Sequence, residues 1–548
     1  MKTVCKSLFT RCIASVLTLV VAATSFAQSA PEPAVVISIA PVKEQMSDIN
    51  YLVDASGFGQ AKFLIKSQIR YITGGMDSKR PAGALLYFEG DNPEPRTVIF
   101  LPIKDLDELL DTVSNLAEVD DEDEIIKILP PGGDTLYAVK QGTHVFVTTD
   151  EDALAGLPED PASMLGDMPT KYNVGAHLYG DRVPEELREK AIDMIKDGYI
   201  DSLENLGTDP DEVDAKIAEF EQQIEVFEDV DEVVFGMLAD KETHKMAMEF
   251  SITGKPGSKI AKGYAGFANA PASRFAGFMK DTAAMDYSMC FDMNTEDADR
   301  VGTQMETLIE SMMTEIDNDG EFSDEEMDTI RSASVQIAEV VEETVREGRV
   351  DSGGHLMMGD SSLDFVAGGQ VSDPAKVESA VKELVDLIKK RDDDEVVEFK
   401  LDFAKHNGVN MHEILINVPE SEEEVQDFLG TEVTVILGIG KKEVYLAAGN
   451  KPLETLKAAM ANTAAAPDYP VIYNIRVLPI LEYAATTTGQ PMLDSLAEVL
   501  AKEGRDKMTI YSKAITNGVF TRMEMEDGPL AMIKEAYEEW GAIGGPEF

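Results

Sequence analysis

The segment between residues 315 and 326 has the clearest spacing for chemistry, because acidic and hydroxyl residues alternate there around a glycine. Read as the twelve-residue loop of an EF-hand, it places oxygen-bearing residues at positions 1, 3, 5, 7, 9 and 12. Gly320 then falls at position 6, where the chain must turn sharply, and apolar residues at helical spacing predict a helix on either side. The candidate calcium ligands are Glu315, Asp317, Asp319, Glu321, Ser323 and Glu326.

Two features of this segment depart from an EF-hand. Position 1 is Glu315, where the shorter Asp normally fits. The corresponding connection earlier in the chain, Gly207–Asp211, lacks the pattern. In a chain so rich in acids, the same spacing also arises in a glycine-punctuated acidic connector. Calcium binding is therefore one interpretation of the segment, and a solvated connector is the other.

Two short serine motifs are the remaining candidates for catalysis. Ser352, in Val-Asp-Ser-Gly-Gly, is in a sequence similar to that around trypsin-like nucleophiles, and Ser361, in Gly-Asp-Ser, is in one similar to the opening block of GDSL-type hydrolases. A serine nucleophile needs a base within hydrogen-bond reach. The sequence offers no accompanying histidine and aspartate in the contexts of the trypsin-like family. We expect the first motif to be a turn and the second a hairpin tip, and a secreted hydrolase with a loop-borne serine nucleophile is the alternative function.

The sequence gives little support for a metal site built from histidine and cysteine. His406 and His412 lie on the two arms of a hairpin predicted by Asn407-Gly408, but no cysteine or third histidine joins them, so we expect both on the surface. Cys290, the one cysteine after residue 27, lies in an apolar alternating stretch, and we expect it to be buried in a strand. The sequence thus predicts no cofactor other than calcium.

The first 27 residues have the three parts of a secretory signal peptide. Three basic residues precede an apolar run from Cys12 to Ala23, and Ser25 and Ala27 supply the small residues of a cleavage site after Ala27. The apolar run is shorter than the roughly 20 residues that span a bilayer. We predict a protein released into the periplasm or beyond, with no transmembrane segment after the signal peptide.

The charge balance limits the partners. The net charge is −54 at pH 7, and removing the three basic residues of the signal peptide takes it to −57. This excess repels phosphate backbones and anionic lipid surfaces, so nucleic acid and anionic membranes are excluded. Solubility in a saline habitat, binding of divalent cations and docking to a basic partner remain as interpretations.

Apolar patterning predicts an α+β fold made of recurring units. Short alternating segments that begin at Leu85, Thr135 and Val433 form predicted hairpins, and each hairpin is followed by a helical pattern. A longer repeat of strand, two helices and hairpin begins at Tyr172 and again at Met285, with a weaker copy from Val471. We therefore expect repeated strand-strand-helix units that form antiparallel sheets covered by helices. They make two related halves, 28–270 and 271–548, after the signal peptide 1–27.

Two short motifs carry a family resemblance. Gly-Gly-Asp-Thr-Leu-Tyr at 132–137 precedes a predicted hairpin, and Val-Ser-Asp-Pro-Ala-Lys-Val at 371–377 precedes a predicted helix. With the export signal and the recurring units, the chain resembles uncharacterised secreted proteins of planctomycete-type bacteria, and this resemblance implies no known activity. The sequence therefore favours a secreted, strongly acidic, soluble protein with a non-enzymatic binding or envelope-structural role. Calcium is its one candidate modulator, and its partner is an unknown protein or cell-envelope component.

Overall fold

The structure, a computed structural model, describes residues 32–88, 96–205, 217, 220, 228–268, 270–293, 295–319, 322–359, 362–390, 396–418, 426, 430–462 and 467–542. The predicted signal peptide and its cleavage point lie outside these residues. The chain divides into two compact units, which are Met1–Ser258 with Glu526–Phe548, and Lys259–Met525. Helices and strands are mixed in the chain, as the α+β prediction requires. The predicted division at residues 270 and 271 stays a prediction.

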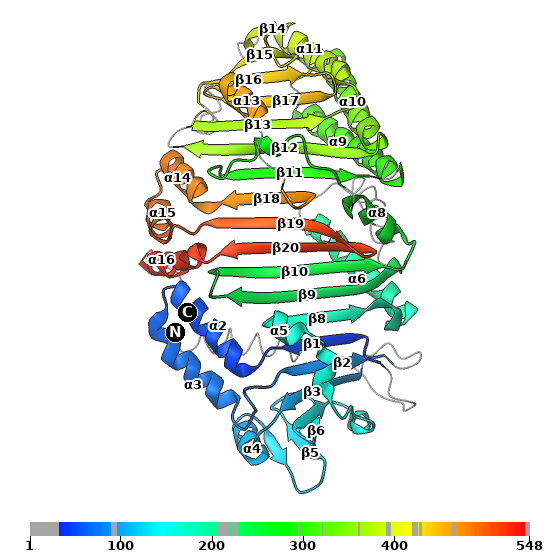
Figure 1. The fold of residues 1–548 in the computed structure, drawn as a ribbon, viewed down its shortest axis with the longest axis vertical. Helices are drawn as coiled ribbons and strands as arrows, with labels where there is room; N and C mark the ends of the chain where they lie inside the picture. The colour runs from blue at the N-terminus through cyan, green and yellow to red at the C-terminus, as the bar shows by residue number, and fades with distance from the viewer. Residues whose placement is uncertain are drawn as a thin grey trace. The chain divides into compact units, whose positions relative to one another are not determined.

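The first unit is built on an antiparallel sheet (Figure 1). Its strands, in sheet order, are β4 (Glu118–Asp120), β5 (Ile126–Leu129), β6 (Leu136–Gln141), β7 (His144–Thr148), β3 (Arg96–Pro102), β2 (Ala82–Tyr87), β1 (Val35–Ile39), β8 (Val174–Tyr179), β9 (Val230–Asp240) and β10 (Lys245–Gly254). The first of these strands along the chain, β1, pairs with β2 on one side and with β8 on the other. It therefore joins the two wings of the sheet.

The helices of the first unit come from both ends of the chain. They are α2 (Val42–Ala55), α3 (Lys62–Ile72), α4 (Leu106–Ser114), α5 (Met168–Lys171), α6 (Glu185–Asn205) and α16 (Gly528–Ala542). Helix α4 begins after Asp105, whose carboxylate accepts hydrogen bonds from two backbone N–H groups of the first turn. Helix α16 packs on α2, and the ring of Tyr537 in α16 meets the ring of Phe58, just after α2, edge-on with centroids 6.2 Å apart.

One face of the first sheet carries the core of the unit. Val36, Leu85, Phe100 and Phe146 are almost fully buried there and pack with Tyr172. Because side chains alternate between the faces of a strand, these residues fix which face of β1, β2, β3 and β7 is covered.

The strands of the second unit are also antiparallel, and we call them the second sheet (Figure 1). Its strands, in sheet order, are β14 (Val396–His406), β15 (Val409–Asn417), β16 (Glu432–Ile439), β17 (Glu443–Gly449), β13 (Ser362–Gln370), β12 (Arg349–Gly359), β11 (Met285–Asp292), β18 (Val471–Arg476), β19 (Lys507–Ile515) and β20 (Gly518–Glu526). The central strand β11 pairs with both β12 and β18.

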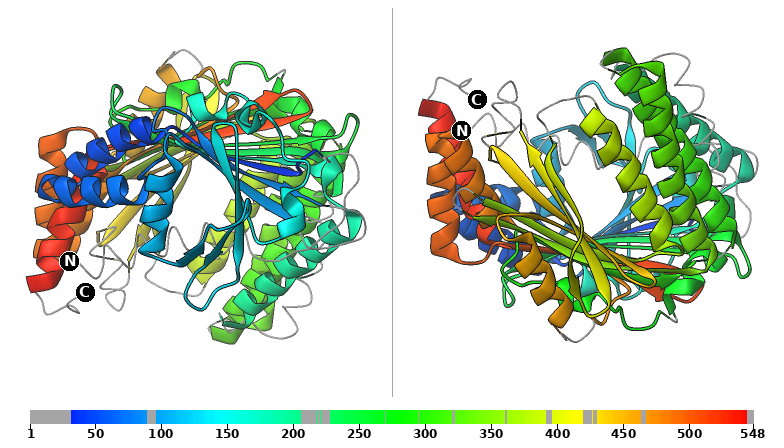
Figure 2. Two further views of the ribbon diagram at one scale, coloured as in Figure 1. Left: turned by 90° about the horizontal axis from the view of Figure 1, so that it is seen from below. Right: turned by 90° about the horizontal axis from the view of Figure 1, so that it is seen from above.

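Helices cover parts of this second sheet. They are α8 (Lys259–Ala268), α9 (Thr295–Asp319), α10 (Asp324–Arg346), α11 (Pro374–Lys390), α13 (Pro452–Ala461), α14 (Val477–Thr488) and α15 (Pro491–Glu503). Helices α9, α10 and α11 lie side by side (Figure 2). Helix α13 packs on β13, β16 and β17 over a core that includes Phe275, Val366, Met411 and Leu456.

Many predicted elements are confirmed. The hairpins β2–β3, β6–β7 and β16–β17 occur where alternation predicted them, and helices α4 and α13 follow the first and the last of these. At the Asn407-Gly408 turn both residues have positive φ, 50° and 86°, as the tight hairpin turn predicted from this pair requires. The repeat that begins at Tyr172 predicts its second helix at Pro210–Phe227, and most of this segment lies outside the described residues.

Candidate functional site

One face of strands β8, β9 and β10 carries nine apolar side chains. Residues that pair directly across strands share a face, and so do residues two apart along a strand. The register therefore gives three rows of three residues, which we call the apolar face: Val174, Met237 and Met248; Ala176, Phe235 and Phe250; Leu178, Val233 and Ile252.

The apolar face is accessible to solvent. Five of its large side chains, Val174, Phe235, Met237, Met248 and Phe250, are each 36–46% exposed. An antiparallel sheet with one solvated face usually presents polar side chains on it. A contiguous exposed apolar patch on a folded protein instead marks a site of interaction. In β10 the predicted alternation of apolar and polar residues is present from Met248 to Thr253, but its apolar residues lie on the solvent-accessible face.

The core of the first unit packs against the opposite face of these strands. On the opposite face of the same strands, the Tyr172 ring lies against Gly175 and Gly236, and a Cβ at Gly236 would come within 2.3 Å of a ring carbon. The Tyr172 hydroxyl donates a hydrogen bond to the Glu249 carboxylate at 2.7 Å. The two glycines thus allow the core to approach the sheet closely on the face opposite the apolar face.

The second unit also has exposed apolar side chains on one sheet face. The rows there are Met285, Ile475, Met508 and Met525, and then Tyr287, Tyr473, Ile510 and Met523. Met285 and Tyr473 are 42% and 37% exposed. The Tyr287 and Tyr473 rings stack with centroids 6.0 Å apart, and the Tyr473 hydroxyl lies 2.9 Å from the Met289 sulfur.

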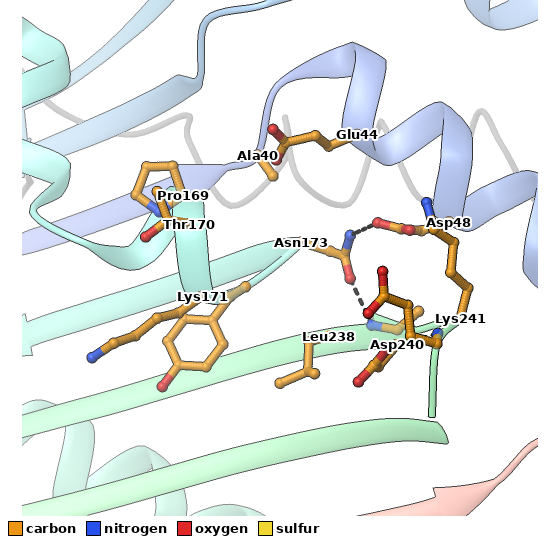
Figure 3. Close-up of a pocket in the computed structure, with 13 residues that line it drawn as sticks. Ala40, Glu44, Asp48, Pro169, Thr170, Lys171, Asn173, Leu238, Asp240 and Lys241 are labelled. Atoms are coloured by element: carbon orange, nitrogen blue, oxygen red, sulfur yellow. Dashed lines mark hydrogen bonds between the residues drawn. The ribbon is translucent and has the colours of Figure 1, made fainter. Parts of the chain in front are cut away.

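A polar cavity of about 280 Å³ lies in the first unit (Figure 3). Its lining includes the charged residues Glu44, Asp48, Lys171, Asp240, Lys241 and Glu242. At its edge, the Asn173 amide donates to the Asp48 carboxylate at 2.6 Å and accepts from the Ala239 N–H at 2.7 Å. Both lysines have partners, because Lys171 pairs with Asp167 and Lys241 donates to Ser47. The excess of carboxylates suits a cationic group.

The predicted EF-hand segment has a helical start and a capped end. Helix α9 runs through Asp319, so the backbone of Glu315, Asp317 and Asp319 is helical, while their side chains and residues 320 and 321, including Glu321, lie outside what the structure describes. Ser323 caps α10, and the Glu326 carboxylate accepts hydrogen bonds from the N–H and the hydroxyl of Ser323, both at 2.7 Å. Within the described residues, no three His, Cys, Asp or Glu side chains are placed to hold a metal ion.

The prediction that residues 350–354 form a turn is wrong, because they lie inside strand β12. Gly353 and Gly354 serve close packing instead: a Cβ at Gly353 would lie 2.7 Å from the Phe275 carbonyl oxygen, and one at Gly354 would lie 2.8 Å from the Tyr287 ring.

Ser352 is not arranged as a nucleophile. Its hydroxyl lies 3.2 Å from the Tyr287 hydroxyl. His355, three residues further along the strand, points to the opposite face, where its Nδ1 lies 2.6 Å from the Phe278 carbonyl oxygen. Ser361 lies outside the described residues.

The histidine prediction is wrong for His412, which is 1% exposed. Helix α11 packs near strand β15 and brings Glu378 to 3.6 Å from the His412 Nε2, while Nδ1 accepts from the Asp402 N–H at 3.2 Å. Cys290 is buried in β11, as predicted, and burial raises the pKa of its thiol. A buried neutral thiol is a poor nucleophile.

Sequence reasoning missed the apolar face, although the sequence contains a signal for it. In β9, Val233, Val234 and Phe235 are consecutive apolar residues, so both faces of the strand are apolar. Such a run is typical of a strand covered on both faces. The exposure of one of these faces needed the structure.

The described part of the chain contains no helix with the length and hydropathy needed to cross a membrane. No known protein family, curated protein or solved structure matches the chain.

Proposed function

We propose that this chain is a non-enzymatic, exported binding protein that holds a protein partner through the apolar face. The observation that carries this proposal is the exposure of five large apolar side chains on three adjacent strands. Aromatic and methionine side chains are enriched at the buried centres of protein interfaces, so exposed Phe and Met on a sheet are suited to contact a partner. Export rests on the signal peptide predicted at residues 1–27.

The large negative charge of the chain favours a positively charged partner. At a net charge of −54, two copies of the chain repel each other, as do the chain and an anionic lipid surface. The same field attracts a basic protein and accelerates its association. The expected partner therefore carries apolar anchor side chains surrounded by Lys and Arg.

We also infer that the chain consists of two related halves. Each strand pairing of the first sheet has a counterpart in the second, with β1 to β10 replaced in order by β11 to β20. A shared order of ten strands, with the central strand paired on both sides in each case, supports a duplication. The exposed residues Met285 and Tyr473 then mark a second contact of the same kind.

A designed peptide tests the binding proposal. An amphipathic helix of about 18 residues made of leucine and lysine combines an apolar stripe with positive charge. We expect it to bind the chain that begins at Gln28, with an affinity that falls as salt screens the charges. A leucine–glutamate helix and a serine–lysine peptide, which each lack one of the two features, should bind at least tenfold more weakly. Fluorescence anisotropy of the labelled peptides measures all three affinities.

The double variant Phe235→Thr/Phe250→Thr locates the binding site. Threonine keeps the strand preference of the backbone but removes both exposed rings, so we expect at least a tenfold loss of peptide affinity with little change in thermal unfolding. Phe63→Thr is the matched control, because Phe63 is an exposed ring on α3 of the same unit. Equal binding by the double variant, or equal loss in the control, would contradict the proposal.

Calcium modulation stays a proposal that thermal unfolding can test. If residues 315–326 bind calcium, the ion raises the stability of the folded state by about 2.7 kcal/mol at a concentration of 100 Kd. The ligands at 317 and 319 lie on a helical backbone, so binding should also unwind the last turn of α9 and lower the helical circular dichroism.

Two variants decide the calcium question at fixed ionic strength. Asp317→Ala removes a ligand, and Glu326→Gln removes a charge while leaving a residue that can still complete the cap of α10. Both variants should lose the calcium-specific rise in the stability of the folded state. If magnesium stabilises the chain as much as calcium does, or if calcium stabilises the two variants equally, the segment is an acidic connector and not a calcium site.

A further inference from the structure

Two methionines face each other on the apolar face. Met237 of β9 pairs directly with Met248 of β10, and the side chains are 46% and 37% exposed. Their neighbours in the adjacent row are Phe235 and Phe250. Both methionine residues are therefore accessible to solvent and have apolar neighbours.

Three other methionines of the chain are shielded. Met168, Met313 and Met411 are 6%, 1% and 0% exposed and pack in hydrophobic clusters. Since oxidation of methionine depends on access of the oxidant to sulfur, these three serve as internal references for Met237 and Met248.

The reaction expected at the two methionines is oxidation of the thioether by a peroxide. The lone pair of the thioether sulfur attacks the terminal oxygen of a hydroperoxide such as hydrogen peroxide. An S–O bond forms as the O–O bond breaks, and the proton of the transferred oxygen passes to the departing oxygen. The methionine becomes a sulfoxide, which is a two-electron oxidation, and the peroxide leaves as water or an alcohol. The product replaces an apolar side chain by a polar one.

We propose that Met237 and Met248 form an oxidation site that switches off binding at the apolar face. This inference rests on the proposed function, because it concerns regulation of the same surface. A sulfoxide at either position would have to be buried without a hydrogen-bond partner when an apolar anchor docks on it, which opposes association. The sulfoxide is reducible by sulfoxide reductases, so the change is reversible.

The first experiment measures where oxidation occurs. The chain from Gln28 onward is treated with hydrogen peroxide, and sulfoxide formation at each methionine is followed by peptide mass spectrometry. Met237 and Met248 are expected to react at least tenfold faster than Met313 and Met411. Equal rates for the exposed pair and the buried references would overturn the proposal.

The second experiment measures the consequence of oxidation. Binding of the leucine–lysine peptide and of an apolar fluorescent dye is measured before and after peroxide treatment, and we expect at least a tenfold weaker affinity for both probes after it. The variant Met237→Leu/Met248→Leu keeps side-chain volume and apolar character, so it should bind both probes. Peroxide treatment should leave its affinity for both probes unchanged.

The two probes separate failure of this inference from failure of the proposed function. If the peptide never binds but the dye does, the dye response alone decides the oxidation site. Treatment with methionine sulfoxide reductases should restore binding in the unmodified chain. Persistent peroxide sensitivity of the Leu/Leu variant would show that other residues are responsible, and the inference would be wrong.

Discussion

A chain that stops after Glu526 is expected to lose the unfolding transition of the first unit and to keep that of the second. The removed segment contains Asp527 and helix α16, which belong to the first unit. Asp527 is 3% exposed, and its carboxylate lies 2.9 Å from both the Tyr51 hydroxyl and the His244 Nδ1. Its N–H also donates to the His244 carbonyl oxygen at 3.0 Å.

The size of this effect follows from what the segment buries. Without it, the side of α2 that contacts α16 becomes exposed to water, and the hydrogen bonds of Tyr51 and His244 to Asp527 are lost. Such losses cost about 3–5 kcal/mol together, a large share of the 5–15 kcal/mol typical of a folded domain.

Differential scanning calorimetry of the full and shortened chains measures the loss. The full chain should show a transition for each unit, and the shortened chain should keep the second of these at an unchanged midpoint. A synthetic peptide of residues 527–548, added in trans, should restore the lost transition by mass action. Equal destabilisation of both transitions would contradict the assignment of α16 to the first unit.

Acid is expected to destabilise both units below pH 6.5, and the second more steeply than the first. His144 in the first unit and His355 and His412 in the second are buried, and burial lowers the pKa of each imidazole from its ordinary value of 6.5. The unfolded chain therefore takes up protons first as the pH falls. Each histidine contributes a loss of at most about 1.4 kcal/mol per pH unit.

The charges around these histidines modify the effect without reversing it. Arg80 lowers the pKa of His144 further and Asp160 raises it. Lys280 acts against protonation of His355, while the Phe278 carbonyl, Asp286 and Asp364 favour it. For His412, Glu378 and Asp402 favour protonation and Lys382 opposes it. Burial is the largest cause in all three, so the direction holds.

Urea unfolding between pH 7.5 and pH 5.5 measures, for each unit, the slope of the free energy of unfolding against pH. His355→Gln should flatten the slope of the second unit over this range, although the variant also changes stability at pH 7.5. His406→Gln is the control, since His406 lies at the tip of the β14–β15 hairpin. Equal slopes for the two units, or an unchanged slope in His355→Gln, would show that other groups govern the acid response.

The sequence predicts local features of this fold well because they depend on neighbouring residues. Asn407-Gly408 fixes its hairpin by its own φ angles, and α11 begins at Pro374, within the motif at 371–377 that predicted a helix nearby. Helices α2 and α3 were not predicted, and little of either helix is buried. In these two helices, Ile69 is the one described residue that is buried.

The candidate site was less accessible to sequence reasoning, because exposure is set by distant parts of the chain. Nothing near His412 in sequence indicates that α11 will approach it, and Gly353-Gly354 has the same composition in a strand as in a turn. Likewise, the runs of apolar residues in β9 indicate two apolar faces but not which of them the rest of the chain covers.

The hydrogen bond between Tyr51 and Asp527 joins residues 476 positions apart. Contacts of such long sequence separation form slowly, because a long loop must close before they stabilise the chain. The first unit begins earlier in the chain, yet it cannot become complete until residues near 540 are available, whereas the second unit needs only a continuous segment. During synthesis from the N-terminus, the second unit should therefore finish folding first. The first would wait with its apolar strands exposed, which makes this interval the step at which a chaperone is most needed.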